Sequence, residues 1–259
     1  MNTLRLKRFL CELSIPLILC GCGGRIAAPQ SFKPQANIYH TVLNDRANRA
    51  KSISGELSVE VWENGERVAV KQLFASIPPN RLRMDTLTPF GQPLSTIIYN
   101  DQLLSVHDRE SNRFMMGEAN RHHFERLTKL NLHPSDMSTL LSGQLPRLRK
   151  EGGGVRWDER LGRTILELTH DDKRQVITFN EADKTPRMTE LYEANVLLVR
   201  VLLADYTKTE PKLPRRLKIE LPASDIKVNT TLTDFTLNPE IPPIAFEIEA
   251  PPGLQPQSL

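Results

Sequence analysis

Hydrophobic and polar residues alternate with a period of two along most of this chain, which is the pattern of β-strands with one buried face. The first such run covers residues 53–62, and the Asn64-Gly65 dipeptide after it favours the tight turn of a β-hairpin. Further runs predict strands at residues 67–77, 82–86, 94–99, 103–107, 113–117, 155–158, 164–170, 175–180, 187–194, 196–206, 213–221 and 226–237, with a last one at 246–248.

The spacing becomes helical in two places. Residues 38–50 predict one helix, and from residue 121 the side chains of Phe124 and Leu127 fall on one face of another. Pro134 then begins a second short helix of this inserted pair, which ends near Gly143. The apolar faces of these helices need a surface to cover, and the concave side of a curved sheet offers one.

Strands in hairpin order pair antiparallel, so we expect a mainly β protein with inserted helices. The sheet should be large, curved, and open or nearly closed. No second change of composition divides the chain, which indicates one domain over residues 37–250 and a disordered tail at 251–259.

The composition is that of a globular protein, with 39% hydrophobic and 25% charged residues. The longest charge-free stretch near the N-terminus, residues 13–24, is shorter than the roughly 20 apolar residues of a membrane-spanning helix. A polytopic membrane protein is therefore excluded. The strand-like alternation also excludes a disordered chain.

The N-terminus has the layout of a secretory signal, with basic residues followed by an apolar stretch. It closes on Leu19-Cys20-Gly21-Cys22, which resembles the lipobox of bacterial lipoproteins. By this resemblance residues 1–21 are removed, the Cys22 sulfur carries a diacylglycerol, and residues 22–36 are a lipidated tether. Gly23 stands where Asp would retain an enterobacterial lipoprotein in the inner membrane, so the resemblance favours the outer membrane. An ordinary secretory signal that happens to contain cysteine is the alternative.

Removal of residues 1–21 changes the charge and the thiol content. The remaining chain has 31 basic and 30 acidic residues, because three of 34 basic and one of 31 acidic residues leave with the signal. A net charge near +1 gives no reason to expect nucleic acid as a partner. Cys22 is the one cysteine left, so no disulfide can form within the chain.

The sequence carries no catalytic or metal-binding motif. His122 and His123 are adjacent and point to different faces of a helix, and no histidine pair has ligand spacing. Glycine-rich phosphate loops and nucleophile motifs are also absent. We therefore expect no enzyme activity, no cofactor and no metal, while a hydrolase whose groups converge only in space stays open as a third possibility.

One loop places a large aromatic residue between prolines, in Pro89-Phe90-Gly91-Gln92-Pro93. Phe90 could fold back as a plug on the core. It could instead be an exposed apolar tip that contacts a membrane or a client protein.

These features together resemble the LolA/LolB superfamily of lipoprotein carriers, and most of all the LolB-like outer-membrane lipoprotein receptors. The matching motifs are Ser54-Gly55-Glu56-Leu57 at the first strand, residues 87–92 as the projecting apolar loop, residues 124–143 as the inserted helices, and residues 212–235 as the final hairpin. The Pro-rich end, residues 238–253, is more similar to the soluble carrier. Phe90 stands where the receptors usually have Leu.

The resemblance implies an open (unclosed) antiparallel β-barrel of about 11–12 strands covered by a helical lid, with a hydrophobic cavity for lipid or acyl chains between them. Candidate cavity residues are those that point inward by parity or come from the lid: Leu57, Val59, Val61, Leu82, Met84, Ile98, Phe124, Leu127 and Leu140. A packed core without ligand is the competing interpretation of the same residues.

The implied function is reception of client lipoproteins from a periplasmic carrier protein and their insertion into the outer membrane, by a monomer that faces the periplasm. Pro89, Phe90 and Gly91 would form the membrane- or client-contact loop. The alternative is a structural or regulatory envelope lipoprotein with the same fold and no transferred ligand.

Overall fold

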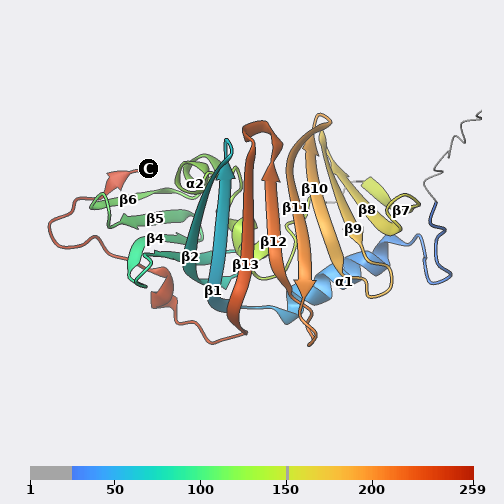
Figure 1. Cartoon of the computed structure of the whole chain (residues 1–259), viewed down its shortest axis with the longest axis horizontal. Helices are drawn as coiled ribbons and strands as arrows, with labels where there is room; N and C mark the ends of the chain where they lie inside the picture. Colours follow the sequence, from blue (N-terminus) through green and yellow to red (C-terminus); the bar gives the residue numbers. More distant parts are fainter. Residues whose placement is uncertain (1–24, 150–151) are drawn as a thin grey trace, which may run out of the picture.

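A computed structural model of the chain describes residues 25–149 and 152–259. The proposed signal, the lipobox and Cys22 lie outside the described residues. The core of the structure is one 14-stranded sheet, in the order β14-β6-β5-β4-β3-β2-β1-β13-β12-β11-β10-β9-β8-β7. Figure 1 shows this sheet as a long, curved wall with helices behind it.

The helices are α1 (Ala36–Arg49), α2 (Arg121–Thr128) and α3 (Pro134–Leu141), with short 3-10 turns η1 (Pro222–Ser224) and η2 (Pro243–Phe246). The strands of the first half are β1 (Ile53–Glu63), β2 (Glu66–Ile77), β3 (Arg81–Leu87), β4 (Pro93–Asn100), β5 (Leu103–Asp108) and β6 (Arg113–Glu118). Those of the second half are β7 (Gly152–Asp158), β8 (Arg163–His170), β9 (Lys173–Phe179), β10 (Pro186–Glu193), β11 (Val196–Tyr206), β12 (Pro214–Leu221), β13 (Ile226–Leu237) and β14 (Gln257–Ser258).

The first strand joins the two halves, because β1 pairs with β2 on one side and with β13 on the other. A bulge falls between Glu56 and Leu57 of β1, next to Gly55. A Cβ on Gly55 would lie 2.1 Å from the carbonyl oxygen of Asp234, so only glycine allows the two backbones to approach this closely. Every pairing within β1–β13 is antiparallel, and the short β14 pairs parallel with β6.

The three helices cover one face of the sheet, and their apolar side chains join the strands in one core. Tyr39 of α1 packs on Phe179 of β9, with 5.1 Å between ring centroids. Phe124 of α2 and Leu140 of α3 are buried in the same cluster. The expected fold class is confirmed: the protein is mainly β, with an unclosed sheet covered by helices.

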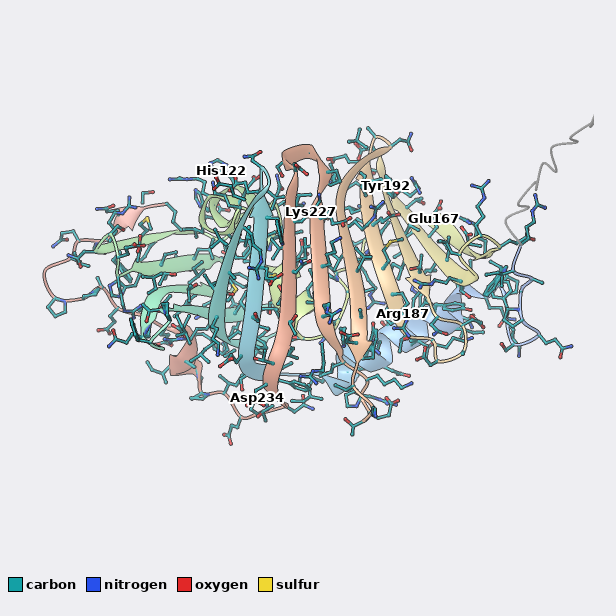
Figure 2. All side chains as sticks on the ribbon, in the orientation of Figure 1. His122, Glu167, Arg187, Tyr192, Lys227 and Asp234 are labelled. Atoms are coloured by element: carbon teal, nitrogen blue, oxygen red, sulfur yellow. The ribbon has the colours of Figure 1, made fainter. Side chains whose placement is uncertain are left out.

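The opposite face of the sheet carries charged residues in cross-strand register. Arg200 donates hydrogen bonds to Glu190, at 2.7 Å, and to Glu220, at 3.2 Å. Figure 2 shows Glu167, Tyr192 and Lys227 on β8, β10 and β13 along this face. Such a surface is solvated and gives no reason to expect an apolar partner there.

The structure corrects two expectations at the C-terminal end of the fold. Residues 246–248 form no strand, because Pro243–Phe246 makes the turn η2, which packs against β3 and β4. Residues 251–259 are not a disordered tail: Gln257 and Ser258 pair with β6, and Leu259 donates its N–H to the Met116 carbonyl oxygen at 3.0 Å.

Ile98 faces away from the helices, contrary to its expected place in the cavity. It lies directly opposite Arg83 in the register of β3 and β4, whereas Ile97 lies opposite Met84. Directly paired residues share a face, and Arg83 donates to the Ala245 carbonyl oxygen of η2, at 3.1 Å. Ile98 is therefore buried on the outer face, and Ile97 takes its place in the core under the helices.

Candidate lipid-binding site

The centre of the fold, where sequence reasoning places one large cavity, is packed. Leu57, Val59, Leu82, Met84 and Phe124 are all buried members of a single core cluster. None of them lines the cavities described below. Of the candidate cavity residues, Leu140, Leu127 and Val61 line the openings around this packed centre.

One apolar cavity of about 160 Å³ lies between α3 and strands β9–β11. Its walls are mainly aliphatic: Leu132, Leu140, Leu148, Leu191, Val199 and Val201. Gln175 contributes the polar contact at its floor and is fully bonded there. Its amide nitrogen donates to the Pro146 carbonyl oxygen at 2.7 Å, and its amide oxygen accepts from the Leu148 N–H at 2.9 Å.

Charged side chains stand at the edge of this first cavity. Arg121 and Asp136 form an ion pair of 3.6 Å. Burial raises the pKa of the Asp136 carboxyl, against the opposing effect of Arg121. Burial likewise lowers the pKa of Arg147, which donates to Asn44 Oδ1 at 2.8 Å. These groups can meet the polar head of a ligand while the aliphatic walls hold its apolar part.

A larger cavity of about 410 Å³ lies between strands β4–β6 and α2. Its apolar lining is Leu94, Ile97, Val106, Met115, Leu127 and Leu259, and its charged lining is Asp108, Glu110, Arg113 and Arg126. This volume falls within the range of about 300–1,000 Å³ typical of small-molecule sites, whereas the first cavity is smaller. The larger cavity is therefore the better candidate for an acyl chain.

Leu259 closes one side of this larger cavity. Its Cβ lies over Gly117 of β6, where a Cβ added to the glycine would come within 2.8 Å of it. A third opening, at the β1–β2 hairpin, is wider still at about 510 Å³. Its apolar lining is only Val61, Val68 and again Leu127, and the rest of its lining is polar, which makes it the poorer site for an acyl chain. Leu127 of α2 therefore lines both openings.

The two inserted helices are fastened to the sheet in different ways. Ser138 of α3 is fully buried: its Oγ donates to the Arg81 carbonyl oxygen at 2.9 Å and lies 2.7 Å from Ser76 Oγ. Among the described residues, α2 has no hydrogen bond to the sheet comparable to this serine contact. Its His123 ring bonds to the Glu118 carbonyl oxygen at the end of β6, at 2.8 Å, but this contact is exposed, unlike the buried bonds of Ser138. The part of the lid over the larger cavity is thus the less firmly held part.

The Phe90 loop is an exposed tip. The Gly91 N–H donates to the Thr88 carbonyl oxygen at 2.9 Å, and the Thr88 N–H donates to the Gln92 carbonyl oxygen at 2.8 Å. These bonds make a tight turn in which Gly91 takes a φ of +81°, a conformation that suits glycine. The Phe90 side chain is 93% exposed, so it is not a plug.

The tip stands beside the mouth of the larger cavity. Leu94 and Ser95 line that cavity and follow the loop directly in the chain. The neighbouring turn between β5 and β6 is joined to them, since the Arg109 N–H donates to the Leu94 carbonyl oxygen at 3.0 Å. An exposed aromatic side chain and a partly apolar opening therefore share one corner of the molecule.

Sequence reasoning missed the polar residues at the first cavity and the strand residues of the second. Gln175, Arg121 and Asp136 lie far apart in the sequence and meet only through the fold. Val106 belongs to a strand that was expected, and its inward parity, shared with its partner Met115, was the signal that could have found it. No cluster of three His, Cys, Asp or Glu residues able to hold a metal occurs within residues 25–149 and 152–259.

Comparison with solved structures identifies the fold. A domain named for outer membrane lipoprotein sorting, from Vibrio parahaemolyticus, superposes with a TM-score of 0.58 over 82% of this chain and 97% of that one, at 12% identity. A LolA superfamily protein from Nitrosomonas europaea superposes with a TM-score of 0.55 over 81% of this chain and 97% of that one, at 14% identity. This chain has the LolA-type fold. A DUF1329 family protein from Desulfovibrio piger shares it, with a TM-score of 0.58 over 83% of this chain and 98% of that one, at 12% identity.

The LolA-type likeness rests on structure alone. No family model matches the sequence, and no curated protein matches it either. Identities of 12–14% establish a shared fold and leave the specific activity to the site. In the described part of the chain, no helix has the length and apolarity needed to cross a bilayer.

Proposed function

We propose that this protein is an outer-membrane-anchored lipoprotein that binds the acyl chains of client lipoproteins, or another lipid, and delivers them to the bilayer. One observation supports the proposal: the exposed Phe90 stands beside a cavity of about 410 Å³ at α2, whose lining combines aliphatic and charged side chains. A LolB-like receptor needs both a site that shelters acyl chains and an apolar tip that contacts the client lipoprotein or its carrier.

Burial of apolar surface would drive both steps of such a transfer. Each buried methylene contributes about 0.8 kcal/mol, so an acyl chain moves from a shallow site to a deeper one without nucleotide hydrolysis. Binding of a long chain needs more space than the larger cavity offers at rest. The less firmly held α2 supplies it, because displacement of Leu127 joins this cavity to the opening at the β1–β2 hairpin.

The remaining assignments follow from the same proposal. Cys22 carries the lipid anchor, the domain faces the periplasm, and the partner is a soluble periplasmic carrier that presents the client. The protein acts as a monomer and has neither an enzyme activity nor a cofactor. The ligand is held by apolar walls, with Arg113 and Arg126 at the rim for a polar head group.

The test is lipid co-purification with the Cys22→Ser protein, measured by native mass spectrometry and by extraction. Met115→Trp fills the larger cavity and should reduce bound lipid several-fold. Met188→Trp is the matched control, because Met188 pairs with Leu202 on the outer face of the sheet. Equal lipid content in both variants, at equal melting temperature, would contradict the assignment of the cavity.

The packed centre of the fold favours a second function, that of a structural or regulatory envelope lipoprotein without a transferred ligand. Leu57, Val59 and Phe124 fill the space that a large lipid would occupy. Under this alternative, the Cys22→Ser protein purifies without lipid, and Met115→Trp changes only its stability.

A further inference from the structure

Residues 25–32, which the sequence assigns to a tether, lie against the hairpin of β7 and β8. The Ile26 N–H donates to the Glu159 carbonyl oxygen at 2.8 Å, and Trp157 Nε1 donates to the Ile26 carbonyl oxygen at 2.7 Å. The Phe32 ring packs on Trp157, with 5.8 Å between centroids. Figure 1 shows the start of the described chain beside β7 and β8, at one end of the long axis.

This docked segment completes a surface patch of mixed apolar and basic character. Ile26 is 50% exposed and Leu161 is 52% exposed, at the tip of the hairpin. The Ile26 side chain lies over Gly162, where an added Cβ would meet it at 2.8 Å. Four exposed arginines belong to the same two segments: Arg25 precedes Ile26, and Arg156, Arg160 and Arg163 lie on the β7–β8 hairpin. We call these six residues the seating patch.

Two acidic residues also face the seating patch, and both are already engaged. Glu159 pairs with Arg25 at 3.6 Å. Asp158 accepts the N–H groups of Arg160 and Leu161 and pairs with Arg156 at 3.6 Å, and the hydrogen bond from Leu161 chiefly holds its pKa below the ordinary value. Four arginines against two carboxylates leave the patch with an excess of positive charge. Exposed apolar side chains among arginines are the composition of a surface that lies on anionic lipid.

The position of the lipid anchor indicates which lipid surface that is. Cys22 precedes Arg25 by three residues, so the two Cα atoms are at most about 11 Å apart. Acyl chains attached to Cys22 therefore enter the bilayer next to the seating patch. The docked segment brings the patch and the anchor to the same end of the domain.

We infer that the seating patch rests on the anionic phospholipid head groups of the membrane that holds the anchor, and so fixes the orientation of the domain. This inference rests on the proposed acylation of Cys22. The chemistry of the contact is that of guanidinium groups on lipid phosphates, with Ile26 and Leu161 inserted between head groups.

The orientation has a consequence for the Phe90 loop. In sheet order, the β3–β4 connection and the β7–β8 hairpin are nine strand spacings apart, which at about 4.8 Å each is about 43 Å along the sheet. The antiparallel register also makes the two connections leave from opposite ends of the strands. With the patch seated, Phe90 points away from the anchoring membrane, toward a periplasmic protein that carries the client.

The test places an environment-sensitive fluorophore on single cysteines of the acylated protein in vesicles that contain phosphatidylglycerol. In the acylated protein the Cys22 sulfur already carries the diacylglycerol and cannot react with the fluorophore. The label therefore reports one position at a time. We expect spin-labelled lipid to quench a probe at Leu161→Cys strongly and a probe at Phe90→Cys weakly. Lys227→Cys, exposed on the charged face of the sheet, is the control position.

Two results would overturn the inference. One is a probe at residue 161 that stays as unquenched as the control. The other is a probe at residue 90 that is quenched as strongly as the one at 161, which would place the Phe90 tip on the anchoring membrane instead.

A second measurement separates the patch from the anchor. The Cys22→Ser protein should sediment with phosphatidylglycerol vesicles at least tenfold more than with phosphatidylcholine vesicles, and Arg160→Glu with Arg163→Glu should abolish the difference. Arg67→Glu, on the β1–β2 hairpin, is the matched control. Loss of lipid co-purification would contradict the proposed function and leave this result unchanged, whereas equal sedimentation of all variants would overturn the patch.

Discussion

The Tyr39 hydroxyl donates a hydrogen bond of 2.7 Å to Glu181 Oε2, which joins α1 to the loop after β9. Both side chains are buried, and Thr164 also donates to the same carboxylate oxygen. Burial raises the pKa of Tyr39 to about 12, so this tyrosine stays a donor at physiological pH. Burial also opposes ionisation of Glu181, but hydrogen bonds from Lys184, Thr164 and Tyr39 outweigh it and hold the pKa of Glu181 below its ordinary value.

This relationship predicts an acid-sensitive attachment of α1. A carboxyl whose pKa is lowered by folding stabilises the protein above its unfolded pKa of about 4.3, and that contribution is lost as the pH falls through the lower folded value. We therefore expect Glu181→Gln to lower the free energy of unfolding by about 1–3 kcal/mol at pH 7. Between pH 5 and pH 2, the free energy of unfolding of this variant should fall by less than that of the wild type. Urea denaturation at pH 7 and from pH 5 to pH 2 measures both effects. If the free energies of unfolding of the two proteins fall in parallel with pH, Glu181 contributes nothing to the acid sensitivity.

The two helices of the lid should open at different rates. Ser138 fastens α3 to β2 and β3 through buried hydrogen bonds, whereas α2 lacks such contacts among the described residues. Amide exchange should be faster in α2 than in α3, and slowest at residues 57–61 of β1. Ser138→Val removes the fastening and should bring α3 to the rate of α2. Equal protection of all three segments would favour a rigid core over a lid.

Phe90 should matter for transfer and not for stability. Because its side chain is 93% exposed, Phe90→Ala should change the free energy of unfolding by no more than about 0.5 kcal/mol. Reception of the client from its carrier, and with it delivery to liposomes, should fall in the same variant, while Phe90→Leu keeps an apolar tip and retains both. A large drop in melting temperature with normal transfer per folded molecule would exclude the tip assignment.

Acylation should depend on Cys22 alone. Cys22→Ser is expected to release the protein from membranes after a salt wash, because the patch by itself binds weakly and with salt sensitivity. The melting temperature should not change, since Cys22 precedes the docked segment. Mass spectrometry of the wild type should show the acylated N-terminal peptide, and an unmodified Cys22 in a membrane-bound protein would contradict the lipobox assignment.

Much of the sheet was predictable because β-strand periodicity is a local property. Alternation such as that of Leu57 and Val59 marks a strand wherever one face is buried and the other is wet. The Asn64-Gly65 turn likewise requires only the positive φ angles that these two residues adopt. The order of strands and helices followed from these local signals, and with it the antiparallel pairing. The unclosed form of the sheet was implied by the family resemblance, since the local signals left it open or nearly closed.

Alternation along a strand does not show which residues face the helices when both faces of the strand are covered. Ile97 and Ile98 are adjacent, apolar and buried, so the sequence alone does not say which of them meets the helices. The answer depends on η2, which arrives from the far end of the chain and covers the outer face of β3 and β4.

The sequence by itself determined the strands, the hairpins, the inserted helices and the loop that carries Phe90, because these depend on periodicity and turn chemistry within a few residues. Only the tertiary structure decided that the centre is packed, that the cavities flank it, and that Ile26 lies on the hairpin of Trp157. These features depend on side-chain volume and on contacts between segments more than a hundred residues apart. No local pattern encodes them, because packing fills or leaves a space only after the whole sheet has curved around the helices.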